Sequence, residues 1–345
     1  MKLKSILWYF VTLILAIALL LYVFRDIDLK VLWAKLKAAN FAYVYISIAM
    51  SLVSHYFRGY RWTLLLKPLG YRLNSFRAFI AVMVGYFANL LVPRMGEVTR
   101  CAILKKTDNI PMPASLGSVI SERLLDLILL LFIIVATFII EFSTLKDFLY
   151  EQLHSAYKSF DLGNFLIGAG LVALIFVTGI YLISRNKAFI RTLGFYKKLR
   201  PFAYELINGL NSIRKLENKS AFFISTLIIW GLYYTMSYII VFSFPATSNL
   251  GLAAGLSILM AGGLGMTAPV QSGIGTYHAF VSGVLILYGI GKEDGLLFAT
   301  LVHTSQFISL MFFGGLSFLI SFFLKKDPYG NEKQNITPGG STPGN

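Results

Sequence analysis

The sequence predicts an all-α polytopic membrane protein, and three observations lead to that fold class. Hydrophobic residues make up 57% of the chain and charged residues 14%, whereas a soluble domain is roughly 45–50% apolar and about 25% charged. Apolar runs of about 18 residues or more, the length that crosses a bilayer as a helix, recur along the whole chain. Basic residues gather in particular connections, as they do on the cytoplasmic side of membrane proteins.

Six apolar runs are predicted to be full spans. They are Ile6–Phe24, Phe41–Leu66, Ser118–Ile140, Leu162–Ser184, Ser220–Val241 and Gly295–Phe323. The first is longer than the apolar core of a signal peptide, about 7–15 residues, and no small-residue cleavage site follows it, so we expect it to be retained. Residues 1–326 are therefore predicted to form one transmembrane domain. Residues 327–345, rich in Gly, Pro, Asn and Thr, are predicted to be a disordered cytoplasmic tail.

Two further apolar segments are interrupted and are predicted to be re-entrant hairpins. Phe76–Val92 is followed by a break at residues 93–97. Leu250–Ala268 is followed by a break at residues 269–275 and by another apolar stretch to Ile290. Proline removes a backbone donor and glycine loosens the helix. Such breaks persist at membrane depth only where protein or a wet cavity satisfies the freed backbone groups.

Loop charges predict the orientation of the spans. Arg185–Lys219 holds nine Lys and Arg residues against two acids and is expected in the cytoplasm, whereas Glu141–Asp161 holds four acids and two lysines and is expected outside. Both termini are then cytoplasmic, in a multi-pass protein of the inner (cytoplasmic) cell membrane. Arg25–Ala39, with four basic residues on the outer side, is expected to lie as an amphipathic helix on the interface. The two hairpins open to opposite faces, which indicates an inverted repeat with a midplane binding site.

The first group of candidate functional residues surrounds the first break. It consists of Asn89, Pro93, Arg94, Gly96, Glu97 and Arg100. Glu97 and Arg100, three apart, are close enough on a helix to pair, and a helix N-terminus attracts anions. One interpretation is a phosphate site made by Arg94 and Arg100 with Glu97 fixing their positions. The alternative is a cytoplasmic turn with an ordinary ion pair.

A second group lies where charges run into an apolar span. It consists of Glu122, Arg123 and Asp126, with His55, Arg58 and Arg61 on the second span. Glu122 and Asp126 share a helix face, and a charge near the bilayer centre, costing about 2.5–3.5 kcal/mol, is usually paired and functional. Arg58, Arg61 or Arg94 could supply the cation, although Arg61 is expected to snorkel to the surface. The alternative is that the acids cap the span at headgroup level.

A third group follows the second break. It consists of Pro269, Gly273, Gly275, Thr276, Tyr277 and His278. The glycines would let backbone approach a ligand, and a helix starting near Thr276 would point its N–H groups at the break. His303 and Gln306, in the last span, could contact the site, but helix–helix hydrogen bonds are expected for both.

Several signatures are absent from the sequence. There is one cysteine, Cys101, expected to be buried and inert. There is no Walker A loop, no HExxH, no GxSxG and no cysteine–histidine metal spacing. We therefore expect no metal, no cofactor and no enzymatic activity. The net charge of +15 is explained by positive loops rather than by nucleic-acid binding.

These motifs resemble the flippase-like transmembrane region of lysylphosphatidylglycerol synthases, in a stand-alone form. The resemblance rests on residues 89–100, 121–126 and 269–278. It implies translocation of an anionic lipid and functional roles for Arg94, Glu97, Arg100, Glu122, Arg123 and Asp126. The family's double glycine is Ser272-Gly273 here and its glutamate is His278, which argues against a scheme that needs a carboxylate in the second hairpin. The aminoacyl-transferring domain is absent, so lipid lysinylation is not expected.

Three functions remain in competition. The first is a flippase for a phospholipid or a polyprenyl-phosphate carrier. The second is an intramembrane enzyme acting on a lipid phosphate, with Glu97, Asp126 or His278 as acid or base. The third is a membrane subunit that docks a cytoplasmic synthase through Arg185–Lys219. The opposed hairpins favour the flippase, with an anionic membrane lipid as its partner.

Overall fold

The computed structural model describes residues 17–25, 29–142, 211–268 and 270–325, together with a few single positions. These single positions are Ile14, Thr144, Lys146, Tyr204 and Ile207. Every regular element in the described ranges is an α-helix or a 3-10 helix, so the all-α class is confirmed. The predicted span Leu162–Ser184, most of Ile6–Phe24, Pro269 and the tail lie outside the described residues.

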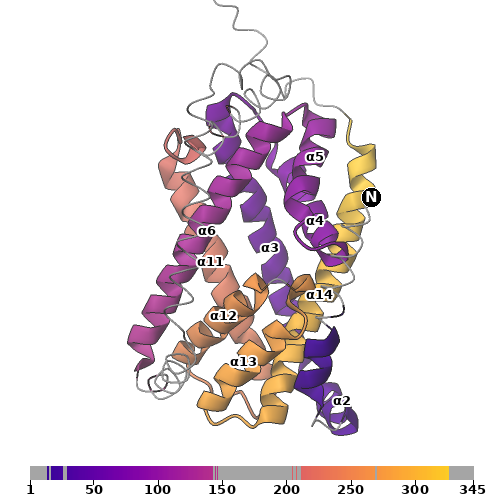
Figure 1. Cartoon of the computed structure of the whole chain (residues 1–345), viewed down its shortest axis with the longest axis vertical. Coiled ribbons are helices and arrows are strands. Elements are labelled where there is room, and N and C mark those ends of the chain that lie inside the picture. The colour runs from indigo at the N-terminus through magenta and orange to yellow at the C-terminus, as the bar shows by residue number, and fades with distance from the viewer. Residues whose placement is uncertain are drawn as a thin grey trace, which may run out of the picture.

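Four long helices run the length of the molecule (Figure 1). They are α3 (Phe41–Leu66), α6 (Met112–Ile140), α11 (Lys219–Ile239), continued by η3 (Ile240–Ser243), and α14 (Lys292–Phe323). By length and composition α6, α11 with η3, and α14 could each cross a membrane. Helix α3 has 26 residues, enough for about 39 Å, but its buried face carries serines, a histidine and two arginines. This polar inner face lowers its hydropathy.

The first broken segment is a hairpin of α4 (Ser75–Leu91) and α5 (Gly96–Asp108). The side-chain oxygen of Asn89 accepts a hydrogen bond from the Gly96 N–H at 2.6 Å, and a Cβ at Gly96 would collide with the carbonyl oxygen of Gly85. Asn89 and Gly96 therefore close the hairpin, as the sequence predicted for the break.

The second broken segment is a hairpin of α12 (Leu252–Thr267) and α13 (Thr276–Leu287), joined by a tip that contains η4 (Gln271–Gly273). The Thr276 hydroxyl donates to the carbonyl of Gly265 at 2.7 Å, which ties the start of α13 to the end of α12. The tip turns sharply because Ser272, Gly273 and Gly275 all have positive φ. Helix α13 starts at the residue that the sequence indicated.

The two hairpins approach from opposite ends of the molecule and meet tip to tip. Figure 1 shows α4 and α5 in the upper half and α12 and α13 in the lower half. Gln271, at the second tip, donates through Nε2 to the carbonyl of Leu90 in the last turn of α4 at 2.9 Å. His303 of α14 holds the same tip through a contact of 2.8 Å with the carbonyl of Ser272. The predicted pair of opposed hairpins is confirmed.

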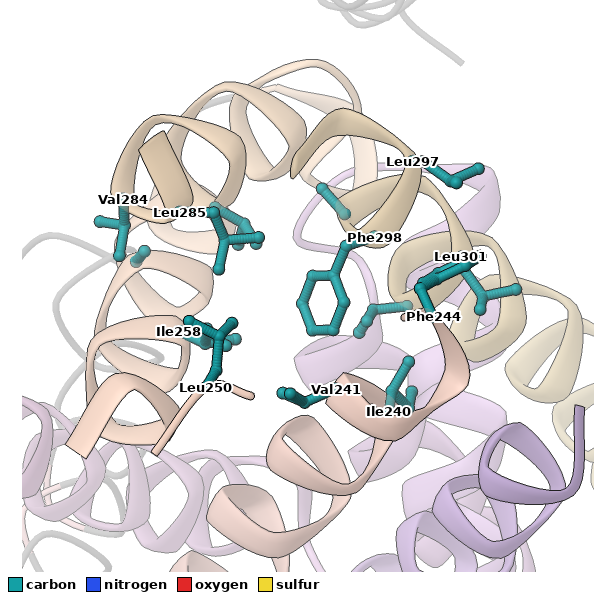
Figure 2. Close-up of a cluster of buried hydrophobic side chains, with 14 of the residues drawn as sticks. Ile240, Val241, Phe244, Leu250, Ile258, Val284, Leu285, Leu297, Phe298 and Leu301 are labelled. Atoms are coloured by element: carbon teal, nitrogen blue, oxygen red, sulfur yellow. The ribbon is translucent and has the colours of Figure 1, made fainter. Parts of the chain in front are cut away.

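Each hairpin has its own apolar core. Figure 2 shows one cluster, in which Phe298 of α14 lies among side chains of α12, α13 and η3, including Ile258, Leu285 and Val241. The other cluster packs Trp62 and Leu66 of α3 against α4, α5 and the start of α6. Polar residues are concentrated between these two clusters, where the tips meet.

A short helix, α2 (Leu29–Lys37), precedes α3. Lys35 donates to Asp294 at the start of α14 at 2.6 Å, while Trp33 stays 58% exposed. The expected amphipathic helix is thus present, with a large apolar side chain left outside the protein core.

Gly96→Ala should destabilise the protein by about 1–3 kcal/mol, because backbone rather than a flexible side chain occupies the position of the new Cβ. Thermal denaturation in detergent would measure the change. Gly231→Ala is the matched control: no atom lies within 4 Å of its Cβ position in α11, and this variant should be neutral or more stable by up to about 1 kcal/mol. Equal thermal stability of the two variants would contradict the close contact.

Membrane topology can be tested with single cysteines placed in a Cys101→Ser background. The positions are exposed: Asn74 and Lys105 at the base of the first hairpin, and Asn249 and Lys292 near the base of the second. Because the hairpins open to opposite ends, an impermeant thiol reagent added outside should label only Asn249→Cys and Lys292→Cys. Labelling of Asn74→Cys or Lys105→Cys from outside would reject the orientation.

Candidate functional site

A buried carboxylate on α6, that of Glu122, gathers arginines from two other helices. Arg58 of α3 donates to it through Nε at 2.7 Å, Arg61 of α3 lies 3.3 Å away, and Arg100 of α5 lies 3.1 Å away. The Glu122 side chain is fully buried. An isolated buried charge would be very costly, so these arginines compensate the carboxylate, and the carboxylate compensates them.

Asp126 lies one turn after Glu122 on the same face of α6, as predicted. It accepts from Arg58 and from Arg61, each at 2.8 Å. Of the three cations that the sequence offered, Arg58 and Arg61 neutralise the two carboxylates. The prediction that Arg61 snorkels was wrong: its side chain has no exposed surface, because Asp126, Glu122 and the hydroxyl of Thr226 provide partners inside the protein.

The expected pair between Glu97 and Arg100 is not formed. Arg100 is buried, lies over the ring of Trp62 at 4.7 Å and pairs with Glu122. Glu97 pairs instead with Arg123 at 3.0 Å. Adjacent residues on α6 point about 100° apart, so Glu122 and Arg123 each take one partner from α5. The phosphate site expected from Arg94 and Arg100 together is therefore not assembled.

A cavity of about 690 Å³ lies between the tips of the two hairpins. Its wall includes nine of the candidate residues named from the sequence: His55, Arg58, Asn89, Pro93, Arg94, Glu97, Arg123, Gly273 and Tyr277. Three of these are arginines and one is a glutamate, so the wall has an excess of positive charge. Helices α3, α4, α5, α6, α11, α12, α13 and α14 all contribute to it.

The other proposed residues lie behind this wall. Arg100, Glu122 and Asp126 form the buried ion cluster. A Cβ at Gly275 would lie 2.7 Å from the Cβ of Leu19, so that glycine makes room for the first helical segment rather than for a ligand. His278 is buried against Phe24 and His303, with ring centroids 5.9 and 4.9 Å away. Thr276 closes its own hairpin and Gly96 closes the other.

Arg94 presents a free guanidinium to the cavity. It is exposed and makes no ion pair with any residue that the structure describes. Its φ of 61° is uncommon for a residue other than glycine. By contrast, every nitrogen of Arg58 is bound, by Glu122, Asp126 and the hydroxyls of Tyr86 and Tyr233. Arg94 is therefore the arginine best placed to bind an anion, with Arg58 adding charge from behind.

Two serines of the site were missed in the sequence, although His55 and Arg58 on the same helix were named. Ser47, Ser51 and His55 line the cavity together with Arg58, and their spacing of about four residues puts them on one face of α3. The feature of the sequence that could have revealed them is the helical periodicity of these polar residues within an apolar span. Gln306 of α14 donates to Ser47 of α3 at 3.3 Å, which is the expected helix–helix bond, whereas His303 contacts the tip of the second hairpin. Both residues line the cavity.

The described residues contain no group of three or more His, Cys, Asp or Glu side chains placed to hold a metal ion. Cys101 is buried, as expected. Besides its arginines, the cavity wall carries hydroxyl, imidazole and amide groups, among them those of Ser51, His55 and Gln306.

Together the fold and site define a polytopic α-helical membrane protein in which two opposed hairpins enclose a cationic cavity. The chain belongs to the lysylphosphatidylglycerol synthase TM region family, whose model matches residues 9–314. It is 25% identical to the UPF0104 membrane protein MJ1595 of Methanocaldococcus jannaschii, over 78% of this chain and 83% of that protein. It is 33% identical to the glycosyltransferase AglD of Haloferax volcanii, over 26% of this chain and 15% of that protein. No solved structure matches.

Glu122→Gln should sharply reduce folded protein, because it leaves three buried arginines around a neutral amide; breaking a buried pair costs about 3–5 kcal/mol. Glu217→Gln is the matched control, since Glu217 also has a partner at 2.7 Å, Lys67, but both side chains are 53% exposed. An exposed pair contributes about 0–1 kcal/mol. Fluorescence-detected size exclusion with a thermal ramp would compare them; equal loss in both variants would contradict the assigned role of the cluster.

Proposed function

We propose that the protein is a translocase for an anionic lipid, either a phospholipid or a polyprenyl-phosphate-linked carrier, in the cytoplasmic membrane. The observation that carries the proposal is the position of the cavity. It lies where two hairpins from opposite ends meet, which is the arrangement in which a central site can open to one side and then the other.

The cavity wall suits both parts of a lipid. Arg94 and the Glu97–Arg123 pair offer charge for a phosphate head group. Helix α12 contributes Ile258, Leu259 and other apolar or small residues, against which an acyl or prenyl chain can lie. A lipid would bind with its head group on the polar wall and its chain along α12.

Movement of the tips would control access. The contact between Gln271 and the Leu90 carbonyl closes the space between the hairpins, and its loss would let one hairpin shift against the other. Each hairpin packs in a separate apolar cluster, so each can move as a unit. Such rocking of two bundles around a fixed site is how alternating access works in inverted-repeat transporters.

The enzyme interpretation has weaker support. Of its candidate acid or base groups, Asp126 and Glu97 are ion-paired and His278 lies behind the cavity wall. The sequence carries no nucleophile, metal or nucleotide signature. The docking interpretation depends on Arg185–Lys219, most of which lies outside the described residues. The activity in the name of AglD belongs to a protein of which the match covers 15% and is not part of the proposal.

A vesicle assay tests the proposal. The protein is placed in phosphatidylcholine vesicles, and dithionite is added outside to bleach NBD-lipid that has moved to the outer leaflet. NBD-phosphatidylglycerol should be bleached faster than NBD-phosphatidylcholine. Arg94→Gln should lower the translocation rate of NBD-phosphatidylglycerol by about tenfold or more, because a charge-assisted hydrogen bond is worth about 1.5–3 kcal/mol.

Lys105→Gln is the control for that assay. It removes one positive charge from an exposed position near the base of the same hairpin, away from the residues that line the cavity. It should leave the rate unchanged. Equal wild-type rates for both lipids, or an unchanged rate in Arg94→Gln, would reject the proposed function.

A further inference from the structure

We propose that the cavity takes a lipid phosphate whose head group ends in an uncharged sugar. This inference rests on the proposed function, and narrows it to a substrate class: one phosphate near Arg94, then a hydroxyl-rich group deeper along α3, with no amine.

The first reason is the order of polar groups along one wall. Charge is concentrated around Arg58, Arg94 and Arg123, and neutral polar groups follow on α3 at His55, Ser51 and Ser47. The Ser47 hydroxyl is already bonded to Met236 and Gln306, so the open part of this wall runs from Arg58 to Ser51, seven residues of helix or about 10 Å. This is more than a phosphate or a glycerol needs. A phosphate followed by one or two sugar rings matches both the order and the length.

The second reason is a set of buried polar atoms that lack partners. Nδ1 of His55 and Oγ of Ser272 have no hydrogen bond with any residue that the structure describes, and both residues line the cavity. His55 is only 6% exposed. Leaving such an atom unpaired costs about 1–3 kcal/mol. Hydroxyl groups, which both donate and accept, would satisfy an imidazole nitrogen and a serine hydroxyl alike.

The geometry of His55 fits this role. Its other nitrogen, Nε2, lies 3.3 Å from the hydroxyl of Ser51, and its ring lies 4.5 Å from that of Tyr86. The ring is therefore held in place by its neighbours, while Nδ1, covered by the protein, has no partner among the described residues; we assign this atom to the head group. Ser272 lies at the second hairpin's tip, so a head group that reaches both atoms would span the two hairpins.

The third reason is the charge balance, which disfavours a cationic head group. The carboxylate among the lining residues is that of Glu97, and it is already paired with Arg123. Glu122 and Asp126 are bound by arginines behind the wall. An aminoacyl or aminoethyl group would face arginines with no unpaired carboxylate among the residues that line the cavity, whereas a neutral sugar meets no such repulsion.

Binding by four compounds tests the inference. They are hexadecyl phosphate, its glucosyl phosphodiester, its aminoethyl phosphodiester, and glucose 1-phosphate. Each would compete with an NBD-labelled alkyl phosphate on purified full-length protein, with fluorescence anisotropy as the readout. The glucosyl diester should bind about five- to tenfold more tightly than hexadecyl phosphate, the gain expected from one or two neutral hydrogen bonds. The aminoethyl diester should bind more weakly than either.

His55→Phe should remove that advantage. Phenylalanine keeps the ring beside Tyr86 but removes both nitrogens, so the glucosyl diester and hexadecyl phosphate should then bind within about twofold of each other. Tyr56→Phe is the matched control, because Tyr56 is the next residue on α3 and is 43% exposed; it should keep the full preference. If His55→Phe is poorly folded, Gln306→Leu provides a second test of the same wall and should reduce the preference in the same direction.

The outcomes separate the two proposals. If no alkyl phosphate binds, the proposed function fails. If all three alkyl compounds bind equally, or if His55→Phe and Gln306→Leu both keep the preference, the sugar inference fails and the anionic translocase stands. If glucose 1-phosphate binds as tightly as its lipid ester, the ligand is a free sugar phosphate and the lipid source is overturned.

Discussion

The arrangement of this protein depends on one buried carboxylate, that of Glu122. Because it lies in an apolar surrounding, it must be compensated, and it draws Arg58 and Arg61 from α3 and Arg100 from α5. The three helices are thereby fixed around α6. The same pairing turns Arg100 away from the cavity and leaves Arg94 without an acidic partner among the described residues. The nearby acid on α5, Glu97, is bound by Arg123, so Arg94 remains the unpaired arginine of the cavity wall among the described residues.

The hairpins divide the molecule into two apolar clusters joined by a polar seam. At the seam, contacts such as Gln271 to the Leu90 carbonyl and His303 to the Ser272 carbonyl are single hydrogen bonds. A net hydrogen bond contributes only about 0.5–1.5 kcal/mol, while the clusters each bury many large side chains. At the tips themselves few strong contacts join the two hairpins, whereas α4 packs along α14 through Phe87, Gly314 and Phe318, and the cavity lies between the tips.

Hydropathy was sufficient to predict the long helices that the structure describes and the two breaks, and loop charge predicted that the hairpins point in opposite directions, because the bilayer leaves few choices for an apolar chain. The bounds of α3 agree with the prediction at both ends. The pairing of Arg100 was not predictable from spacing, since a partner on another helix, Glu122, competes with Glu97 three residues away. Nor was the role of Gly275, which is set by Leu19 of a distant segment. Tertiary partners decide between local alternatives that the sequence leaves equal.

The sequence spacing of the ion cluster has a consequence for biosynthesis. Arg58 and its partner Glu122 are 64 residues apart, whereas Ser47 and Gln306 are 259 apart. At about 5–20 residues per second, the first pair is available after roughly 3–13 s of translation and the second after roughly 13–52 s. A charged helix leaving the translocon is therefore neutralised early, by the next long helix made. The first hairpin, Ser75–Asp108, is synthesised between the two members of the first pair, whereas the Ser47 hydroxyl of α3 can meet Gln306 only after the last helix has been made.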